Sequence, residues 1–370
     1  MTKKRILFSG YAKVHFVCFF PVYQQLRNDP EIDIYLSGGF KSTDGDDVSF
    51  SVDGFYDDFD VDHSKVLSAA ETKNMDFDVL VCAHLSDALF PRSANRTVQI
   101  FHGVSFKNLA VREKALRYDY LCLPGQYHAE QYRKQGLIRS DASTALLTGF
   151  PKTDLLMALK DQPRQLVENL GLDPALPTLL FAPTGDKHNS LEIMGKAVID
   201  ALVGDGRWNL MVKPHDHPKR DTNWFSKLAS REGPRMKLLH DFDIAPALAS
   251  ADLLLTDASS VALEYTLLDR PMIFLDTPKL FEKLKKRAPA LDLETYGRKL
   301  GKIVEGPESI VEAVESSLAD PSTEAAIRRQ AAEHLFHRPG AASERIAKVV
   351  RHAAGLEPSL PEDVERVSTD

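Results

Sequence analysis

The chain has 370 residues, of which 43% are hydrophobic and 27% are charged, and its formal net charge is −7 at pH 7. This composition is typical of a soluble globular protein, and the length predicts two domains rather than one. The negative charge excludes an overall field that would attract nucleic acid or anionic lipid.

Cysteine usage and hydropathy both point to the cytoplasm. Cys18, Cys82 and Cys122 are widely spaced in apolar surroundings and form no CxxC pair, so we expect reduced core residues. No apolar run has the length of a transmembrane helix, and polar residues interrupt the apolar stretch near the N-terminus. A cytoplasmic location without a signal peptide is expected.

Short apolar runs alternate with helical patterns along most of the chain. This alternation predicts an α/β fold with two Rossmann-like, doubly wound domains of parallel strands and right-handed crossovers, facing a cleft. The expected strands are residues 5–8, 32–36, 79–83, 98–101, 120–123, 145–148, 178–182, 209–213, 237–239, 253–256 and 272–275.

Breaks in this pattern suggest domain boundaries. We expect an N-terminal domain over residues 1–160 and a second domain over 161–322, since a Pro-punctuated stretch lies between the two sets of strands. Helices over 323–355 are expected to pack across both domains. The polar residues 356–370 predict a flexible tail.

Ligands of such sheets bind beyond the carboxyl ends of the strands, so the residues that follow each strand are the candidates for chemistry. His102 follows strand 98–101 beside Gly103, and Lys107 lies close by. An imidazole has an unperturbed pKa near neutrality, as a general base requires. The alternative is a histidine that only satisfies a hydrogen bond at the strand end.

Cationic and hydroxyl side chains follow the strands of the second half. Thr184 follows strand 178–182, and Lys213, His215 and His217 follow strand 209–213 in the sequence KPHDHP. The His-x-His pair is a weak metal signal because no third ligand is identifiable, so we expect no metal. Stabilisation of a diphosphate or of transition-state charge is the favoured interpretation.

The stretch 251–276 (ADLLLTDASSVALEYTLLDRPMIFLD) has the pattern of a buried strand, a polar turn, a helix and a second strand. Ser259 and Ser260 stand where the helix begins at Val261, and free N–H groups there favour an anion. The alternative is that the serines only cap the helix. The Asp257 carboxylate should repel phosphate, so capping or orienting a neighbour is its expected task.

Several motifs in this order resemble the CDP-glycerol glycerophosphotransferases of teichoic acid and capsule synthesis. They cover roughly residues 97–346 and read FHGVSFKN, TGFPKTDLL, LLFAPTGD, VKPHDHP, TDASSVALEYTLLDRPMIF and GAASERI. The resemblance implies a GT-B fold, with the acceptor in the N-terminal domain and the nucleotide in the second. It implies a glycerol phosphate or other polyol phosphate transfer from a CDP-activated donor, with release of CMP.

The resemblance also implies roles for residues that match its motifs. His102 would be the base and His215 would contact the transferred phosphoryl group. The implied donor-binding residues are Lys213, Thr184, Asp257, Ser259, Ser260, Ser343, Glu344 and Arg345. The expected acceptor-binding residues are Ser9, Gly10 and Lys107. No cofactor is expected beyond the donor substrate.

Some positions depart from the family pattern. Ala258 stands where the family has an aromatic residue, and KPHDHP replaces Arg-x-His-Pro, which leaves open whether His215 or His217 contacts phosphate. The basic stretch 279–287 is either a contact for anionic lipid on the cytoplasmic membrane face or a solvated helix. The acceptor could be a glycan, a lipid-linked molecule or a polymer. Other GT-B enzymes, such as glycosyltransferases or UDP-N-acetylglucosamine 2-epimerases, and a non-catalytic binding module are the alternatives.

Overall fold

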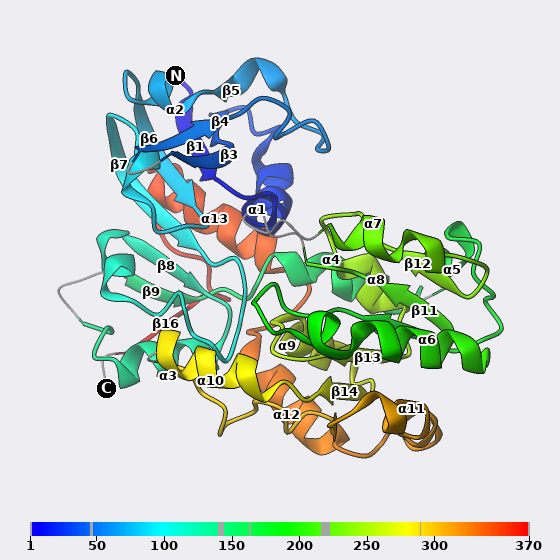
Figure 1. The fold of residues 1–370 in the computed structure, drawn as a ribbon. Coiled ribbons are helices and arrows are strands. Elements are labelled where there is room, and N and C mark those ends of the chain that lie inside the picture. Colours follow the sequence, from blue (N-terminus) through cyan, green and yellow to red (C-terminus); the bar gives the residue numbers. More distant parts are fainter. Residues whose placement is uncertain are drawn as a thin grey trace. The chain divides into compact units, whose positions relative to one another are not determined.

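The computed structural model describes residues 2–44, 47–139, 144–162, 164–215, 223–288 and 290–368. These residues form two compact units (Figure 1). Unit 1 comprises Met1–Gly103, Ala110–Asp154 and His334–Asp370, and unit 2 comprises Val104–Leu109 and Leu155–Glu333. Among the described residues, no helix has both the length and the apolar character needed to cross a bilayer.

Unit 1 is built on an eight-stranded sheet with the order β16-β9-β8-β7-β6-β1-β2-β5. Neighbouring strands are parallel except for β16, which is antiparallel to β9. A separate hairpin consists of β3 (Phe40–Asp44) and β4 (Asp47–Ser51). The sheet strands are β1 (Lys4–Gly10), β2 (Ile32–Gly38), β5 (Val66–Leu67), β6 (Asp76–Cys82), β7 (Ser93–Ile100), β8 (Tyr120–Leu123), β9 (Thr144–Leu147) and β16 (Glu365–Arg366).

Helices from both ends of the chain cover one face of this sheet. α1 (Lys13–Leu26) and α13 (Ala342–Ala353) lie side by side (Figure 1), and both contribute to one apolar core with the strands. A second core on the sheet includes α3 (Gln126–Lys134). The carboxyl-terminal halves of the central strands β1, β6 and β7 are buried on both faces, which explains their apolar runs.

Unit 2 contains a fully parallel six-stranded sheet with the order β12-β11-β10-β13-β14-β15. Its strands are β10 (Thr178–Phe181), β11 (Asn209–Val212), β12 (Met236–Leu238), β13 (Leu253–Thr256), β14 (Met272–Leu275) and β15 (Lys302–Val304). The α-helices between residues 152 and 335 are α4 (Lys152–Leu159), α5 (Gln165–Asn169), α6 (Lys196–Asp205), α7 (Trp224–Leu228), α8 (Ala245–Ser250), α9 (Val261–Tyr265), α10 (Pro278–Arg287), α11 (Ile310–Ala319) and α12 (Ala325–Leu335).

The predicted α/β architecture is confirmed, and each expected strand overlaps a strand of the structure. The five other strands were not predicted, because they are short or exposed: Lys302 and Ile303 of β15, for example, are exposed. The three cysteines are buried and free, as predicted.

The two units correct the expected boundaries. Residues 104–109 and 155–160 belong to unit 2, and α13 belongs to unit 1. The expected tail over 356–370 also needs correction as far as the structure describes it, because β16 pairs with β9 and Val364 is buried. A two-residue strand leaves no periodic pattern from which it could be predicted.

Candidate functional site

His102 lies just beyond β7, at the carboxyl edge of the unit 1 sheet. Its Nδ1 is 2.7 Å from the carbonyl oxygen of Ala83, which follows β6. A carbonyl can only accept, so Nδ1 carries the proton and donates it. The other ring nitrogen, Nε2, is therefore the unprotonated one, as a general base requires.

The surroundings of His102 keep its ring neutral. The residue is exposed, yet packed protein atoms desolvate the ring and lower its pKa below the ordinary value. The hydrogen bond to Ala83 raises the pKa, whereas the positive charge of Lys152 lowers it further. The lowered pKa leaves the ring unprotonated at neutral pH.

Ser9 and Gly10 are the last two residues of β1, at the same edge of the sheet as His102. Ser9 is fully buried, with its Oγ 3.3 Å from Nε2 of His84. A Cβ on Gly10 would lie 3.0 Å from the Cβ of His15, so a glycine relieves crowding here. Ser9 thus makes an internal hydrogen bond, and the expected acceptor contacts of Ser9 and Gly10 stay predictions.

Lys107 lies on unit 2. It was expected among the acceptor-binding residues, but the segment Val104–Leu109 belongs to unit 2. Its Nζ donates to Oγ1 of Thr184 at 2.8 Å and to Oδ2 of Asp186 at 2.9 Å. Lys107 and Thr184 therefore lie together beyond β10, on the unit expected to hold the donor.

An apolar cluster explains why this segment joins unit 2. Phe106 is buried among residues of α10 and Ala258, and its carbonyl accepts from the N–H of Asp292 at 2.8 Å. Ala258 is itself fully buried. The alanine at the position where an aromatic residue was expected is therefore part of a core.

Asp186 joins two cations at this edge. Its second oxygen is 2.8 Å from Arg287 of α10, so the carboxylate pairs with both Lys107 and Arg287. Burial raises the pKa of Asp186, but the two cations outweigh burial and lower the pKa below its ordinary value. Asp186 was not predicted as a site residue, although it follows the same strand as Thr184.

His215 and Lys213 follow β11 as expected. The His215 ring packs against Gly185, where an added Cβ would lie only 2.7 Å from Nδ1. Lys213 is buried, and its Nζ lies 5.9 Å from the centre of the Phe225 ring. His217 lies outside the described residues.

Asp257 organises the loop after β10. Its Oδ1 accepts from the backbone N–H of Thr184, and its Oδ2 accepts from both the N–H and the hydroxyl of Ser190, each at 2.8 Å. The residue is fully buried. These bonds use both carboxylate oxygens to orient the loop, and the expected donor contact of Asp257 stays a prediction.

The serine turn leads into a short helix, and its role as an anion site stays a prediction. The α-helical part of the segment, α9, has five residues and is followed by a 3₁₀ turn over Thr266–Leu268. Ser260 is its N-cap but makes no side-chain capping bond, and Ser259 is buried. A single helical turn has few aligned peptide dipoles, so charge from lysines matters more here than the helix dipole.

Ser343, Glu344 and Arg345 lie on α13 in unit 1. The buried side chains of Ser343 and Arg345 make hydrogen bonds within that unit. Asp154 accepts from the hydroxyl of Ser343 at 2.6 Å, and Nε of Arg345 donates to the carbonyl of Thr148 at 2.8 Å. Glu344 is exposed and pairs with Lys348. These bonds give Ser343 and Arg345 a structural role in unit 1, and the expected donor contacts of the three residues stay a prediction.

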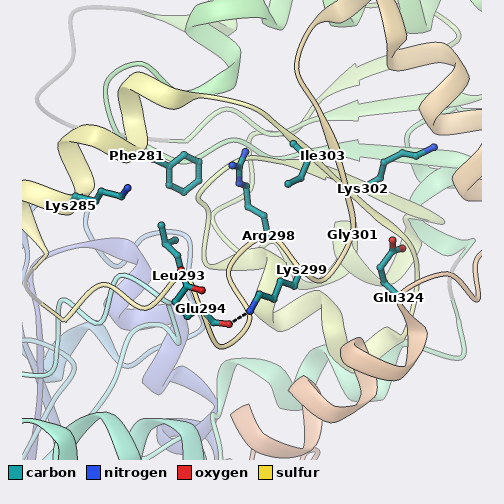
Figure 2. A pocket seen from close by; sticks show the side chains of 10 residues that line it. All are labelled: Phe281, Lys285, Leu293, Glu294, Arg298, Lys299, Gly301, Lys302, Ile303 and Glu324. Carbon is teal, nitrogen blue, oxygen red and sulfur yellow. Dashed lines mark hydrogen bonds between the residues drawn. The ribbon is translucent and has the colours of Figure 1, made fainter.

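A hollow of about 580 Å³ on unit 2 contains none of these residues (Figure 2). Figure 2 shows the Lys299 side chain reaching the backbone oxygen of Glu294. Arg298 pairs with Asp276, and Lys302 donates to Ser316 at 2.7 Å. Three of the four cations that line the hollow thus have partners, and the hollow contains none of the predicted site residues.

Within the described ranges, no group of three or more His, Cys, Asp or Glu side chains could hold a metal ion. Unit 1 carries an imidazole at the carboxyl edge of its sheet, and unit 2 carries lysine, histidine and hydroxyl groups at the edge of its own sheet. Such groups can remove a proton from a hydroxyl and neutralise phosphate oxygens.

A curated protein is similar in sequence to most of this chain. The teichoic acid glycerol-phosphate primase of Bacillus spizizenii is 25% identical over 247 residues, or 66% of this chain. The match covers 58% of that primase, so this chain spans less than two thirds of its relative's length.

Solved structures share the fold. A histidine variant of the wall teichoic acid polymerase TagF, soaked with CDPG, superposes with a TM-score of 0.65 at 17% identity, over 95% of this chain and 88% of that one. A UDP-N-acetylglucosamine 2-epimerase structure from Listeria monocytogenes has a TM-score of 0.61 at 15% identity, over 97% and 99%. These likenesses establish the GT-B fold, as predicted.

A family model distinguishes between these neighbours. The model described as CDP-Glycerol:Poly(glycerophosphate) glycerophosphotransferase matches residues 72–352, which include His102, the loop after β10, the serine turn and α13. The chain belongs to the CDP-glycerol:poly(glycerophosphate) glycerophosphotransferase family.

Proposed function

We propose that this enzyme transfers a glycerol phosphate group from CDP-glycerol to a hydroxyl of a glycan, lipid-linked or polymer acceptor in teichoic acid or capsule synthesis. The observation that supports this most is the tautomer of His102, whose Nδ1–H is held by Ala83 while Nε2 keeps its lone pair. A neutral imidazole with a lowered pKa suits deprotonation of a hydroxyl at neutral pH.

The proposed step is a substitution at the phosphorus that bears glycerol. The acceptor oxygen forms a bond to this phosphorus, the bond to the CMP oxygen breaks, and the acceptor proton moves to Nε2 of His102. Substitution at phosphorus needs alignment and charge neutralisation more than covalent help. Lys107, Lys213, His215 and Thr184 are the groups of unit 2 that we assign to the donor phosphates.

Protein cations supply the charge in this proposal, so we assign no metal ion and no cofactor besides the donor. We place the enzyme in the cytoplasm, in peripheral contact with the membrane where the acceptor is lipid-linked. In α10, Lys283 donates to His188 at 2.7 Å and Arg287 pairs with Asp186, so part of the basic stretch 279–287 serves the fold itself.

The test is to incubate the purified chain with CDP-glycerol and a synthetic glycerol phosphate oligomer, and to measure CMP release and product mass. We expect CMP and an oligomer longer by one or more glycerol phosphate units. Thermal shifts with CDP, UDP and GDP provide a second readout. A shift with UDP alone, without CMP release, would contradict the donor and favour a nucleotide-sugar enzyme.

A further inference from the structure

Four rings gather at the carboxyl edge of the unit 1 sheet, beyond the adjacent strands β1, β6 and β7. The His15 ring lies between two neighbours, with its centre 4.6 Å from that of Tyr11 and 4.7 Å from that of His102. The His84 ring is 5.3 Å from Tyr11 and 6.1 Å from His15. His15 therefore connects the half-buried Tyr11 to the candidate base.

Hydrogen bonds fix the tautomers of the two buried histidines. Nδ1 of His15 accepts from the backbone N–H of Tyr11 at 3.3 Å, and Nδ1 of His84 accepts from that of Ser86 at 3.1 Å. Each ring must then carry its proton on Nε2 in its neutral form. Nε2 of His84 donates to the hydroxyl of Ser9 at 3.3 Å.

The cluster has no formal charge of its own. Burial lowers the pKa of His15 and lowers that of His84 to about 3, so both rings stay neutral. Burial also raises the pKa of Tyr11, so its phenol stays protonated. Within the described residues the Tyr11 hydroxyl has no hydrogen-bond partner, and Lys41 lies 5.5 Å from the centre of its ring.

We propose that Tyr11 and His102 form the acceptor subsite of this enzyme and bind the hydroxyl-bearing end of a polyol, while His15 and His84 are positioning residues. The Tyr11 hydroxyl donates to one acceptor hydroxyl, and Nε2 of His102 accepts from the hydroxyl that reacts. His15 accepts a hydrogen bond from the backbone N–H of Tyr11, and its ring packs against that of His102. The inference rests on the proposed function, because it names the group that the transfer modifies.

The polar groups of Tyr11 and His102 match the hydroxyls of a polyol. The uncharged rings offer a phenol hydroxyl and an imidazole lone pair, which match the hydroxyls of a polyol, while the charge of the buried Lys152 acts on His102. Tyr11 presents an apolar face for the carbons of a polyol and a polar tip for its hydroxyl. Lys41 stands beside the ring and suits a phosphate attached further along the acceptor.

Tyr11→Ala tests the contact, and Tyr11→Phe separates the hydroxyl from the ring. With a synthetic di(glycerol phosphate) acceptor, we expect Tyr11→Ala to raise the acceptor KM by roughly tenfold, the loss of one hydrogen bond with packing, and to leave the KM for CDP-glycerol unchanged. Tyr11→Phe should give an intermediate value. His63→Asn, an exposed histidine of the same unit, is the matched control.

The positioning role of His15 is tested by rescue. The Oδ1 of asparagine can accept from the Tyr11 N–H, whereas leucine cannot, so His15→Asn should retain several-fold more activity with the acceptor than His15→Leu. Circular dichroism and thermal melting check that both variants fold. Equal loss in the two variants, once corrected for the folded fraction, would overturn the positioning role.

Two outcomes separate this inference from the proposed function. If the unaltered chain neither binds CDP-glycerol nor releases CMP with any acceptor, the proposed function fails. If it releases CMP but Tyr11→Ala leaves the acceptor KM unchanged, or changes only the donor KM, the acceptor subsite is wrong while the function stands.

Discussion

The carboxyl edges of the two sheets carry different chemistry. In unit 1 the rings of Tyr11, His15 and His84 surround His102 and remain uncharged. In unit 2 the corresponding edge is ionic, with Lys107 held between Thr184 and Asp186. Under the proposed function, the same kind of parallel sheet serves proton transfer in one unit and phosphate binding in the other, because the side chains after the strands differ.

The largest expected effect comes from removing the neutral base. We expect His102→Ala to lower the rate of CMP release with acceptor by about 10²–10⁴-fold, the range for one positioned general base. The dissociation constant for CDP-glycerol, measured by calorimetry, should stay the same because the donor residues lie in unit 2. A large loss of donor affinity would break the assignment of separate tasks to the two units.

The next effect concerns the ionic edge. Lys107→Met removes the buried ammonium and leaves Asp186 paired with Arg287, so the fold should persist. We expect the dissociation constant for CDP-glycerol to rise roughly 10- to 100-fold, the value of a hydrogen bond to a charged group. Lys285→Met, an exposed lysine of α10, is the control. An unchanged donor affinity together with a raised acceptor KM would return Lys107 to the acceptor side.

Most of the fold could be predicted from the sequence because buried parallel strands consist of uninterrupted runs of apolar residues. Leu253–Thr256 and Met272–Leu275 match β13 and β14 to the residue. The residues after the strands were equally visible, which is why His102, Thr184 and His215 could be listed. Their hydrogen-bond partners come from distant segments and leave no local pattern.

The placements and partners that the sequence did not predict have the same physical origin. Lys107 lies in a six-residue segment that belongs to unit 2, although residues of unit 1 flank it in the sequence. The segment joins unit 2 because Phe106 packs against α10. Arg345 is occupied by a carbonyl of Thr148, nearly two hundred residues earlier in the chain. His15 and His84 stand in apolar contexts, and only the ring distances to Tyr11 and His102 distinguish them from ordinary core histidines.

A smaller effect should appear in the pH profile. The charge of Lys152 opposes protonation of His102, so Lys152→Gln should raise the pKa of that imidazole. The base works unprotonated, and the acid limb of the kcat/KM profile should therefore move to higher pH by a fraction of a unit. His15 and His84 also face His102 but stay neutral across this range. A limb that moves to lower pH, or stays fixed, would show that another group titrates.

The smallest effect is a difference in melting temperature between variants of Ser190, which donates to Asp257, and of Ser260, which begins α9. Ser190→Ala removes a hydroxyl that donates to the buried carboxylate, which costs about 1 kcal/mol and lowers the melting temperature by roughly 2–4 °C in a domain of this size. Ser260→Ala removes no capping bond, so the melting temperature should change by about 1 °C or less. Donor affinity should follow the same order, since Asp257 also holds the N–H of Thr184. If Ser260→Ala instead weakens CDP binding while Ser190→Ala does not, the short helix contacts phosphate directly and the ionic edge of unit 2 extends to the serine turn.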